Sequence, residues 1–155
     1  MSSVASEPVT TTVEGLKQCV GRRLGPTEWR LMTQAEVNRF ADLTGDHQFI
    51  HVDPERAAQT PFGGTIAHGF YSLALLASAT QLLSVTDSVA AINYGLDRVR
   101  FPAPLPIGAE WRGAGELTEV TDVKGGVQVK VTATIEVKGS ERPAVAAECL
   151  LRFLK

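Results

Sequence analysis

Apolar and polar residues alternate along the carboxyl-terminal part of the chain. The segment VQVKVTATIEV, residues 127–137, alternates without interruption, which is typical of a strand with one face in the core and the other in water. Turn-forming residues flank it in VKGG and KGSERP, and residues 110–121 and 144–154 have the composition of neighbouring strands. Residues 90–101, AAINYGLDRVRF, predict a further strand. We therefore predict an antiparallel sheet in this part of the protein.

A long apolar segment precedes the predicted sheet. Residues 66–85, IAHGFYSLALLASATQLLSV, contain no Lys, Arg, Asp or Glu, and about 20 such residues can cross a bilayer as a helix. However, Ser, Thr, Gln and His interrupt the segment, and it lacks basic flanks and aromatic belts. We therefore predict a long helix buried in the core rather than a membrane span.

Capping signals predict shorter helices upstream. Thr11 with Glu14, and Thr33 with Glu36, have the spacing of a capping box. The second of these helices is expected to end at Gly45, because glycine readily takes the left-handed conformation that closes a helix. The sequence DPER then supplies a capping aspartate followed by a proline at the first helical position. Several short helices are thus expected before the long one.

The predicted order of elements is short helices, one long helix and then strands. This order indicates an α+β fold in which an antiparallel sheet wraps around the long helix. The length of 155 residues and the hydrophobic content of 44% suit one globular domain. We predict a flexible N-terminal tail over residues 1–10 and a single domain over residues 11–155.

Charge and cysteine content narrow the class of protein. The net charge of −2 gives no electrostatic basis for binding nucleic acid. Cys19 and Cys149 have neither metal-ligand nor redox spacing, and the N-terminus lacks the basic and apolar regions of a signal peptide. We therefore predict a cytoplasmic protein with reduced thiols that binds neither nucleic acid nor membranes.

The segment GDHQFIH, residues 45–51, lies between a predicted helix end and a predicted helix start. Across such a loop the side chains of Asp46 and His51 can converge. Near neutral pH an ordinary Asp is ionised and an ordinary His is mostly neutral, so both can accept hydrogen bonds from one water and activate it. That chemistry suits hydration or dehydration. The alternative is that Asp46 only caps a turn and His51 is a structural loop residue.

The segment GGTIAHG, residues 63–69, carries a second candidate feature. Its glycines allow a ligand to approach the backbone, and the start of the following helix offers unpaired N–H groups with a partial positive charge. Such a group can stabilise the oxygen of a thioester as it becomes enolate-like. The alternative is that Gly63 and Gly64 form a turn and Gly69 only permits close helix packing.

Together, GDHQFIHVDPERA and the IAHG at residues 66–69 resemble the MaoC-like, R-specific enoyl-CoA hydratase family, whose pattern is roughly G-D-x-N-P-(aliphatic)-H. The resemblance extends from about Thr33 onward and includes NYGLDRVRFPAPLPIG, residues 93–108. It implies a hotdog fold, in which an antiparallel sheet wraps around a long helix, and a homodimer. It also implies that Asp46 and His51 are catalytic and that the amide of Gly69 is the oxyanion donor.

The resemblance suggests further contacts and one departure. Gln48 and Phe49 stand where the family often has Asn-Pro, which changes how the loop is held. The residues that we expect to contact the substrate are Gln48, Phe49, Ala67, His68, Arg98 and Arg100. The two arginines are candidates for binding CoA phosphates, although such residues are more often a solvated strand face. His47 and His68 could join Asp46 and His51 around a metal, but they lack ligand-type helical spacing, and we expect no metal and no cofactor.

The predicted reaction is reversible hydration of a trans-2-enoyl thioester to the (R)-3-hydroxyacyl thioester. The substrate would be an acyl-CoA or an acyl-carrier thioester. One alternative within the same fold is thioester hydrolysis, which would release a free thiol. Another is a non-catalytic acyl-CoA-binding subunit that turns over only with a partner chain or not at all.

Overall fold

An antiparallel sheet forms the body of the protein. The computed structural model describes residues 7–155. The strand order is β2-β6-β7-β8-β5, and β3 also pairs with β6. These strands are β2 (Arg23–Leu24), β3 (Arg30–Leu31), β5 (Ala90–Arg100), β6 (Glu110–Val123), β7 (Gly126–Val137) and β8 (Val145–Leu154). The predicted antiparallel sheet is confirmed, since β6 pairs with β7 and β7 pairs with β8.

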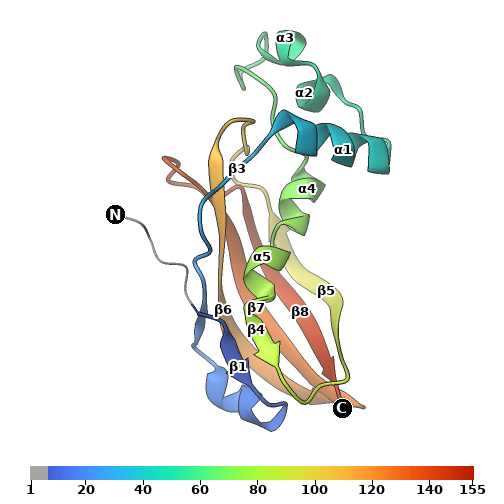
Figure 1. Ribbon diagram of the computed structural model, residues 1–155, viewed down its shortest axis with the longest axis vertical. Coiled ribbons are helices and arrows are strands. Elements are labelled where there is room, and N and C mark those ends of the chain that lie inside the picture. The colour runs from blue at the N-terminus through green and yellow to red at the C-terminus, as the bar shows by residue number, and fades with distance from the viewer. Residues whose placement is uncertain (1–6) are drawn as a thin grey trace.

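One face of the sheet is buried because its strands alternate. Along β7 every second side chain from Val127 to Val137 is buried, and β8 repeats the pattern from Val145 to Phe153. The register places Val131 opposite Cys149, so the buried side chains of the two strands share one face. Figure 1 shows helices α4 (Gly69–Ala74) and α5 (Ala77–Thr80) lying along the strands. Helices α1 (Gln34–Thr44), α2 (Phe49–Val52) and α3 (Pro54–Ala57) gather at one end of the sheet.

The helices are short. They are η1 (Glu14–Cys19, a 3-10 helix), α1 (Gln34–Thr44), α2 (Phe49–Val52), α3 (Pro54–Ala57), α4 (Gly69–Ala74) and α5 (Ala77–Thr80). The two further strands, β1 (Val9–Thr11) and β4 (Leu83–Val85), form a separate parallel pair.

The predicted single long helix over residues 66–85 is wrong in its continuity. The apolar segment forms α4 and α5 separated by a turn, and its end is strand β4. The amide of Leu76 bonds to the carbonyl of Leu73, three residues back, so the turn tightens there and the helix is interrupted. Within residues 7–155 no helix is both long and apolar enough to cross a membrane.

The amino-terminal predictions also need correction. Thr11 belongs to β1 and forms no capping box; instead Thr12 Oγ1 accepts a hydrogen bond from the amide of Gly15 at the start of η1. The predicted tail over residues 1–10 is too long, because Val9 is buried and pairs with Leu83. Residues 1–6 lie outside the described part of the chain.

Two other helix-end predictions are confirmed. Thr33 and Glu36 form a reciprocal capping box at the start of α1, and Gly45 closes that helix in the left-handed conformation with φ of 81°. Asp53 caps α3 by accepting the amide of Arg56, with Pro54 next to it. These two ends fix the length of the loop between α1 and α3.

Candidate active site

The loop that carries Asp46 is held by local hydrogen bonds. After the left-handed turn at Gly45, the Asp46 amide donates to Thr44 Oγ1 at 3.4 Å, and Asp46 Oδ1 accepts from the amide of Gln48 at 3.3 Å. The turn-capping role that we considered for Asp46 is therefore present. It engages Oδ1 only, so the carboxylate keeps capacity to accept further hydrogen bonds.

His51 lies on α2 and is buried. Its Nδ1 is 2.7 Å from the carbonyl oxygen of Ile66. A carbonyl oxygen only accepts, so Nδ1 carries the proton and Nε2 is left with a lone pair. Burial lowers the pKa of His51 below its usual value, and the nearby His68 lowers it further. The bond to Ile66 and the charge of Asp46 raise the pKa, but by less than burial lowers it. The net effect favours a neutral imidazole that can act as a base.

A polar brace connects α1 to the backbone of His51. Gln34 Nε2 donates to the carbonyl oxygen of His51 at 2.7 Å, and Gln34 Oε1 accepts from Thr65 Oγ1 at 2.6 Å. The amide of Ile66 donates to the carbonyl of Ile50 at 3.0 Å. These contacts fix the segment before α4 against the one that carries His51. Gln34 was not singled out from the sequence, since its role depends on contacts between distant segments.

His68 contacts both candidate catalytic residues. Its ring stacks on that of His51, with centroids 3.9 Å apart and planes inclined at 26°. Its Nε2 is 2.9 Å from the main-chain carbonyl oxygen of Asp46, and its side chain is 2% exposed. Phe40 packs on its ring at 4.9 Å between centroids, and Tyr71 stacks on Phe40. The segment IAHG therefore packs against the segment GDHQFIH, so the two candidate motifs lie together in the fold.

Asp46, His51 and His68 form one compact cluster. A carboxylate oxygen of Asp46 and one ring nitrogen of each histidine all lie within 4.8 Å of one another. A carboxylate oxygen and a ring nitrogen no more than 4.8 Å apart can both lie about 2.8 Å from one water, the length of an ordinary hydrogen bond. The distances therefore allow one water to bridge Asp46 and His51.

The same three side chains have donor types that a divalent metal could use. Their arrangement does not favour it, since the two imidazole rings are stacked and nearly parallel. Lone pairs lie in the ring planes, so stacked rings direct them side by side rather than toward one ion. The prediction that the site needs no metal stays a prediction.

Gly69, the predicted oxyanion donor, begins α4 directly after His68. Its amide has no hydrogen-bond partner among the residues that the structure describes. A Cβ at this position would lie 3.4 Å from the ring of Phe101. A hollow of about 290 Å³ adjoins it, lined by Gly69, Ser72, Phe101 and Leu105 among others. The amide is thus available beside an open space.

Three of the remaining predicted contact residues lie in the loop, in α2 and just before α4. Gln48 is exposed and Phe49 is partly buried in the loop and α2, with the Arg56 guanidinium 4.2 Å above the Phe49 ring. Ala67 is buried, and its amide donates to the carbonyl of Leu105. Its side chain therefore contributes packing.

Arg98 and Arg100 lie near the carboxyl-terminal end of β5. Both are exposed, and neither has an ion-pair partner within residues 7–155. The cluster of Asp46, His51 and His68 does not include them. Their proposed role with CoA phosphates stays a prediction.

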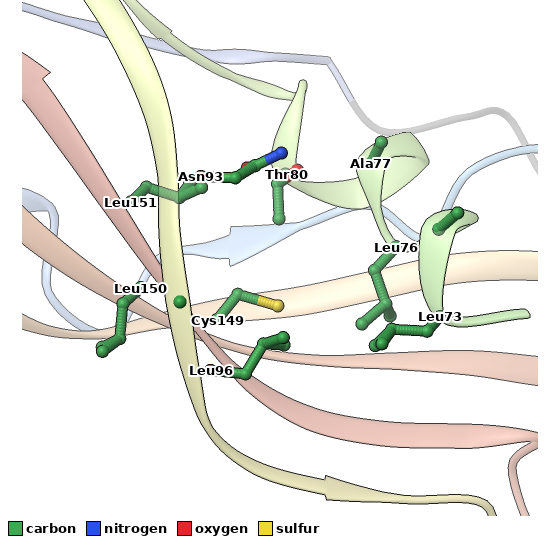
Figure 2. Close-up of a pocket in the computed structure, with 11 residues that line it drawn as sticks. Leu73, Leu76, Ala77, Thr80, Asn93, Leu96, Cys149, Leu150 and Leu151 are labelled. Atoms are coloured by element: carbon green, nitrogen blue, oxygen red, sulfur yellow. The ribbon is translucent and has the colours of Figure 1, made fainter. Parts of the chain in front are cut away.

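A second cavity, of about 270 Å³, lies between the α4–α5 segment and strands β5 and β8. Figure 2 shows Leu73 and Leu76 facing Leu96 and Cys149 across it. Burial raises the pKa of the Cys149 thiol to about 11, so it is uncharged near neutral pH. The cavity is therefore suited to an apolar group.

Known proteins resemble this chain over most of its length. The family model described as "MaoC like domain" matches residues 16–139. The 3-hydroxyacyl-thioester dehydratase Z of Mycobacterium tuberculosis is 51% identical over 145 residues, covering 92% of this chain and 96% of that protein. Nodulation protein N of Rhizobium leguminosarum bv. viciae is 44% identical over 133 residues, covering 83% of this chain and 82% of that protein.

A solved structure of similar fold is the (R)-hydratase from A. caviae involved in PHA biosynthesis. Its TM-score is 0.68 at 27% identity, with 86% of this chain and 96% of that chain covered. The sheet, the helices along its face and the family match all agree with the fold expected from the sequence motifs. The chain belongs to the MaoC-like dehydratases, enzymes of the hotdog fold.

Proposed function

We propose that this protein catalyses the reversible addition of water to trans-2-enoyl thioesters, giving (R)-3-hydroxyacyl thioesters, with Asp46 and His51 as the catalytic pair. One observation carries the proposal: His51 is buried with Nδ1 bonded to Ile66, and a ring nitrogen of His51 lies within 4.8 Å of a carboxylate oxygen of Asp46. Two acceptors close together can orient and deprotonate one water.

In the hydration direction, His51 Nε2 takes a proton from the water while Asp46 accepts its other hydrogen bond. The water oxygen bonds to the β-carbon, and the π electrons of the enoyl bond move toward the thioester carbonyl. The Gly69 N–H stabilises the negative charge that develops on that oxygen. The proton is then delivered to the α-carbon, so that the elements of water are added and no charge remains. Dehydration follows the reverse path.

The substrate is proposed to lie along α4. Gly69 at the start of this helix would bind the thioester carbonyl, while Leu73 and Leu76 line the apolar cavity further along the same segment (Figure 2). An acyl chain is apolar and fits such a lining. Gln48 and Phe49 would flank the reacting end, and Arg98 and Arg100 remain candidates for the CoA phosphates. No group beyond the thioester is required by this scheme.

A homodimer is part of the proposal. Strand β5 is an edge strand that pairs only with β8 within the described chain, and its side chains are largely exposed. The exposed apolar residues on or next to it are Val89, Ile92, Tyr94, Leu96 and Phe101. A second copy of the chain could cover this apolar edge, since unpaired edges invite association.

The reaction is tested by following the absorbance of the enoyl-thioester conjugation with crotonyl-CoA and with a longer enoyl-CoA. We expect the absorbance to fall, chiral analysis to give the (R)-3-hydroxyacyl product, and thiol reagents to detect no free CoA. Release of free thiol would indicate a thioesterase instead. Binding of acyl-CoA with no loss of absorbance would indicate a non-catalytic binding subunit.

A further inference from the structure

His68 is the point at which the two catalytic residues are connected. Its ring face contacts the ring of His51 at 3.9 Å between centroids, and its Nε2 is 2.9 Å from the main-chain oxygen of Asp46. One side chain therefore contacts the base through its ring and the carboxylate-bearing residue through a hydrogen bond.

The ring of His68 is itself firmly held. It is 2% exposed, and Phe40 from α1 packs on it at 4.9 Å. Its main-chain carbonyl accepts the amide of Ser72, so the residue is attached to the first turn of α4. Because the backbone oxygen of Asp46 can only accept, Nε2 of His68 is the donor. Its Nδ1 is buried and has no hydrogen-bond partner among the described residues. Within that part of the chain, hydrogen bonding therefore holds the ring at Nε2 alone.

The contacts restrict two motions that would impair catalysis. Stacking on His51 limits rotation of that imidazole, which is otherwise held by one bond to Ile66. The bond to the Asp46 carbonyl fixes the backbone of a residue whose own side chain is exposed. A displacement of about 1 Å between catalytic groups can lower a rate about 10²-fold, so an anchor for both groups has a direct effect on turnover.

We propose that His68 is a positioning residue that sets the relative placement of His51 and Asp46, acting through them rather than by direct contact with the substrate. The proposal rests on the hydration activity proposed above. It replaces the substrate contact expected for His68, because a side chain this buried offers little surface to a ligand.

The first test is kinetic, with His68→Phe. Phenylalanine keeps an aromatic ring for stacking but cannot donate to the Asp46 carbonyl. We expect kcat to fall about 10²-fold while KM changes little and circular dichroism is unchanged. The matched control is His47→Phe, at an exposed histidine of the same loop, which should keep the wild-type kcat. Wild-type kcat in His68→Phe would overturn the proposal, as would a loss confined to KM.

A double substitution tests whether His68 acts through His51. In the His51→Ala protein the stacking partner is absent, so adding His68→Phe should lower the residual rate by much less than it lowers the wild-type rate. An equal further loss in that background would show an independent role and contradict the proposal. If His68→Phe does not fold, His68→Gln replaces it, since Gln retains a donor but no ring, and the same comparison applies.

A titration gives a readout that does not need activity. Burial lowers the pKa of His51 most, the Ile66 carbonyl and Asp46 raise it, and His68 lowers it further. Histidine NMR should therefore show the His51 pKa rising in His68→Phe while staying below its ordinary value, because the burial remains. An unchanged His51 titration would contradict the proposed coupling. If the wild-type protein shows no hydration but this shift is seen, the proposed function fails while the coupling of His68 to His51 stands.

Discussion

Two Asp/His pairs of equal sequence spacing lie side by side in the chain, and they have opposite environments. In each pair the histidine follows the aspartate by five residues: Asp42 with His47, and Asp46 with His51. His47 Nε2 is 2.9 Å from Asp42 Oδ1, and both side chains are more than half exposed. His51 is buried, and its Nδ1 bonds a backbone carbonyl instead of a carboxylate.

The difference appears in the acid–base behaviour of the two imidazoles. The hydrogen bond that His47 donates to Asp42 raises the pKa of His47, because the carboxylate stabilises the charged ring. Burial lowers the pKa of His51, because the charged ring is poorly solvated there. A neutral imidazole with a free Nε2 can act as a base, whereas His47 uses its Nε2 in a surface ion pair. Environment, rather than spacing, thus distinguishes the proposed catalytic pair from the other.

The largest expected effect comes from replacing one aspartate at a time. Asp46→Asn should lower kcat by about 10²- to 10⁴-fold, the usual contribution of a positioned acid–base group, with the fold intact. Asp42→Asn should leave kcat near the wild-type value, because the one side-chain partner of Asp42 among residues 7–155 is the exposed His47. Steady-state hydration rates of the two purified variants measure this. Equal losses in both would remove the distinction between the pairs.

A smaller effect is expected from breaking the polar brace, in which Gln34 bonds the His51 carbonyl and the Thr65 hydroxyl. Gln34→Leu leaves the Thr65 hydroxyl and the His51 carbonyl without their partner. Leaving buried polar groups unpaired costs about 1–3 kcal/mol, and urea unfolding should show a loss of that size. The control is Asn38→Ala, which removes an exposed partner of Gln34 and should change the free energy of unfolding by less than about 0.5 kcal/mol. No loss in Gln34→Leu would contradict the brace.

The smallest effect is on titration, and its sign differs between the pairs. His51 is neutral in the fold, so its contribution to stability is present above the unfolded pKa of 6.5 and is lost as pH falls toward its lowered value. The contribution of His47 is present below 6.5 and is lost as pH rises through its raised pKa. Histidine NMR should place the midpoint of the His51 titration below pH 6.5 and that of His47 above it. As the pH is lowered, kcat/KM should begin to fall only below pH 6.5, where His51 becomes protonated. The reverse order would contradict the assignment of the base.

The sheet could be predicted closely because its signal is local. The period-two pattern in residues 127–137 determines which side chains of β7 face the core, and β7 spans Gly126–Val137. The capping box at Thr33 and the glycine at position 45 likewise fix the ends of α1 from short-range chemistry. The helix expected over residues 66–85 failed, because its composition indicates burial but does not reveal the turn at Leu76.

The site could be predicted only in part. The motifs indicate Asp46, His51 and Gly69 as candidates, but the exposed Asp42–His47 pair has the same spacing and is not distinguished by it. The roles of Gln34 and His68 depend on contacts between segments far apart in sequence. Those contacts become visible only when α1, α2 and the start of α4 are assembled at one end of the sheet (Figure 1).

The most direct measurement compares His51→Ala with His47→Ala in the enoyl-CoA absorbance assay. The two residues are of one type and lie in one short segment, so they differ mainly in burial and in their partners. We predict that His51→Ala lowers the initial rate by about 10²- to 10⁴-fold and that His47→Ala retains the wild-type rate, with both proteins folded. A His51→Ala protein that hydrates the substrate at the wild-type rate would contradict the assignment of His51 as the base.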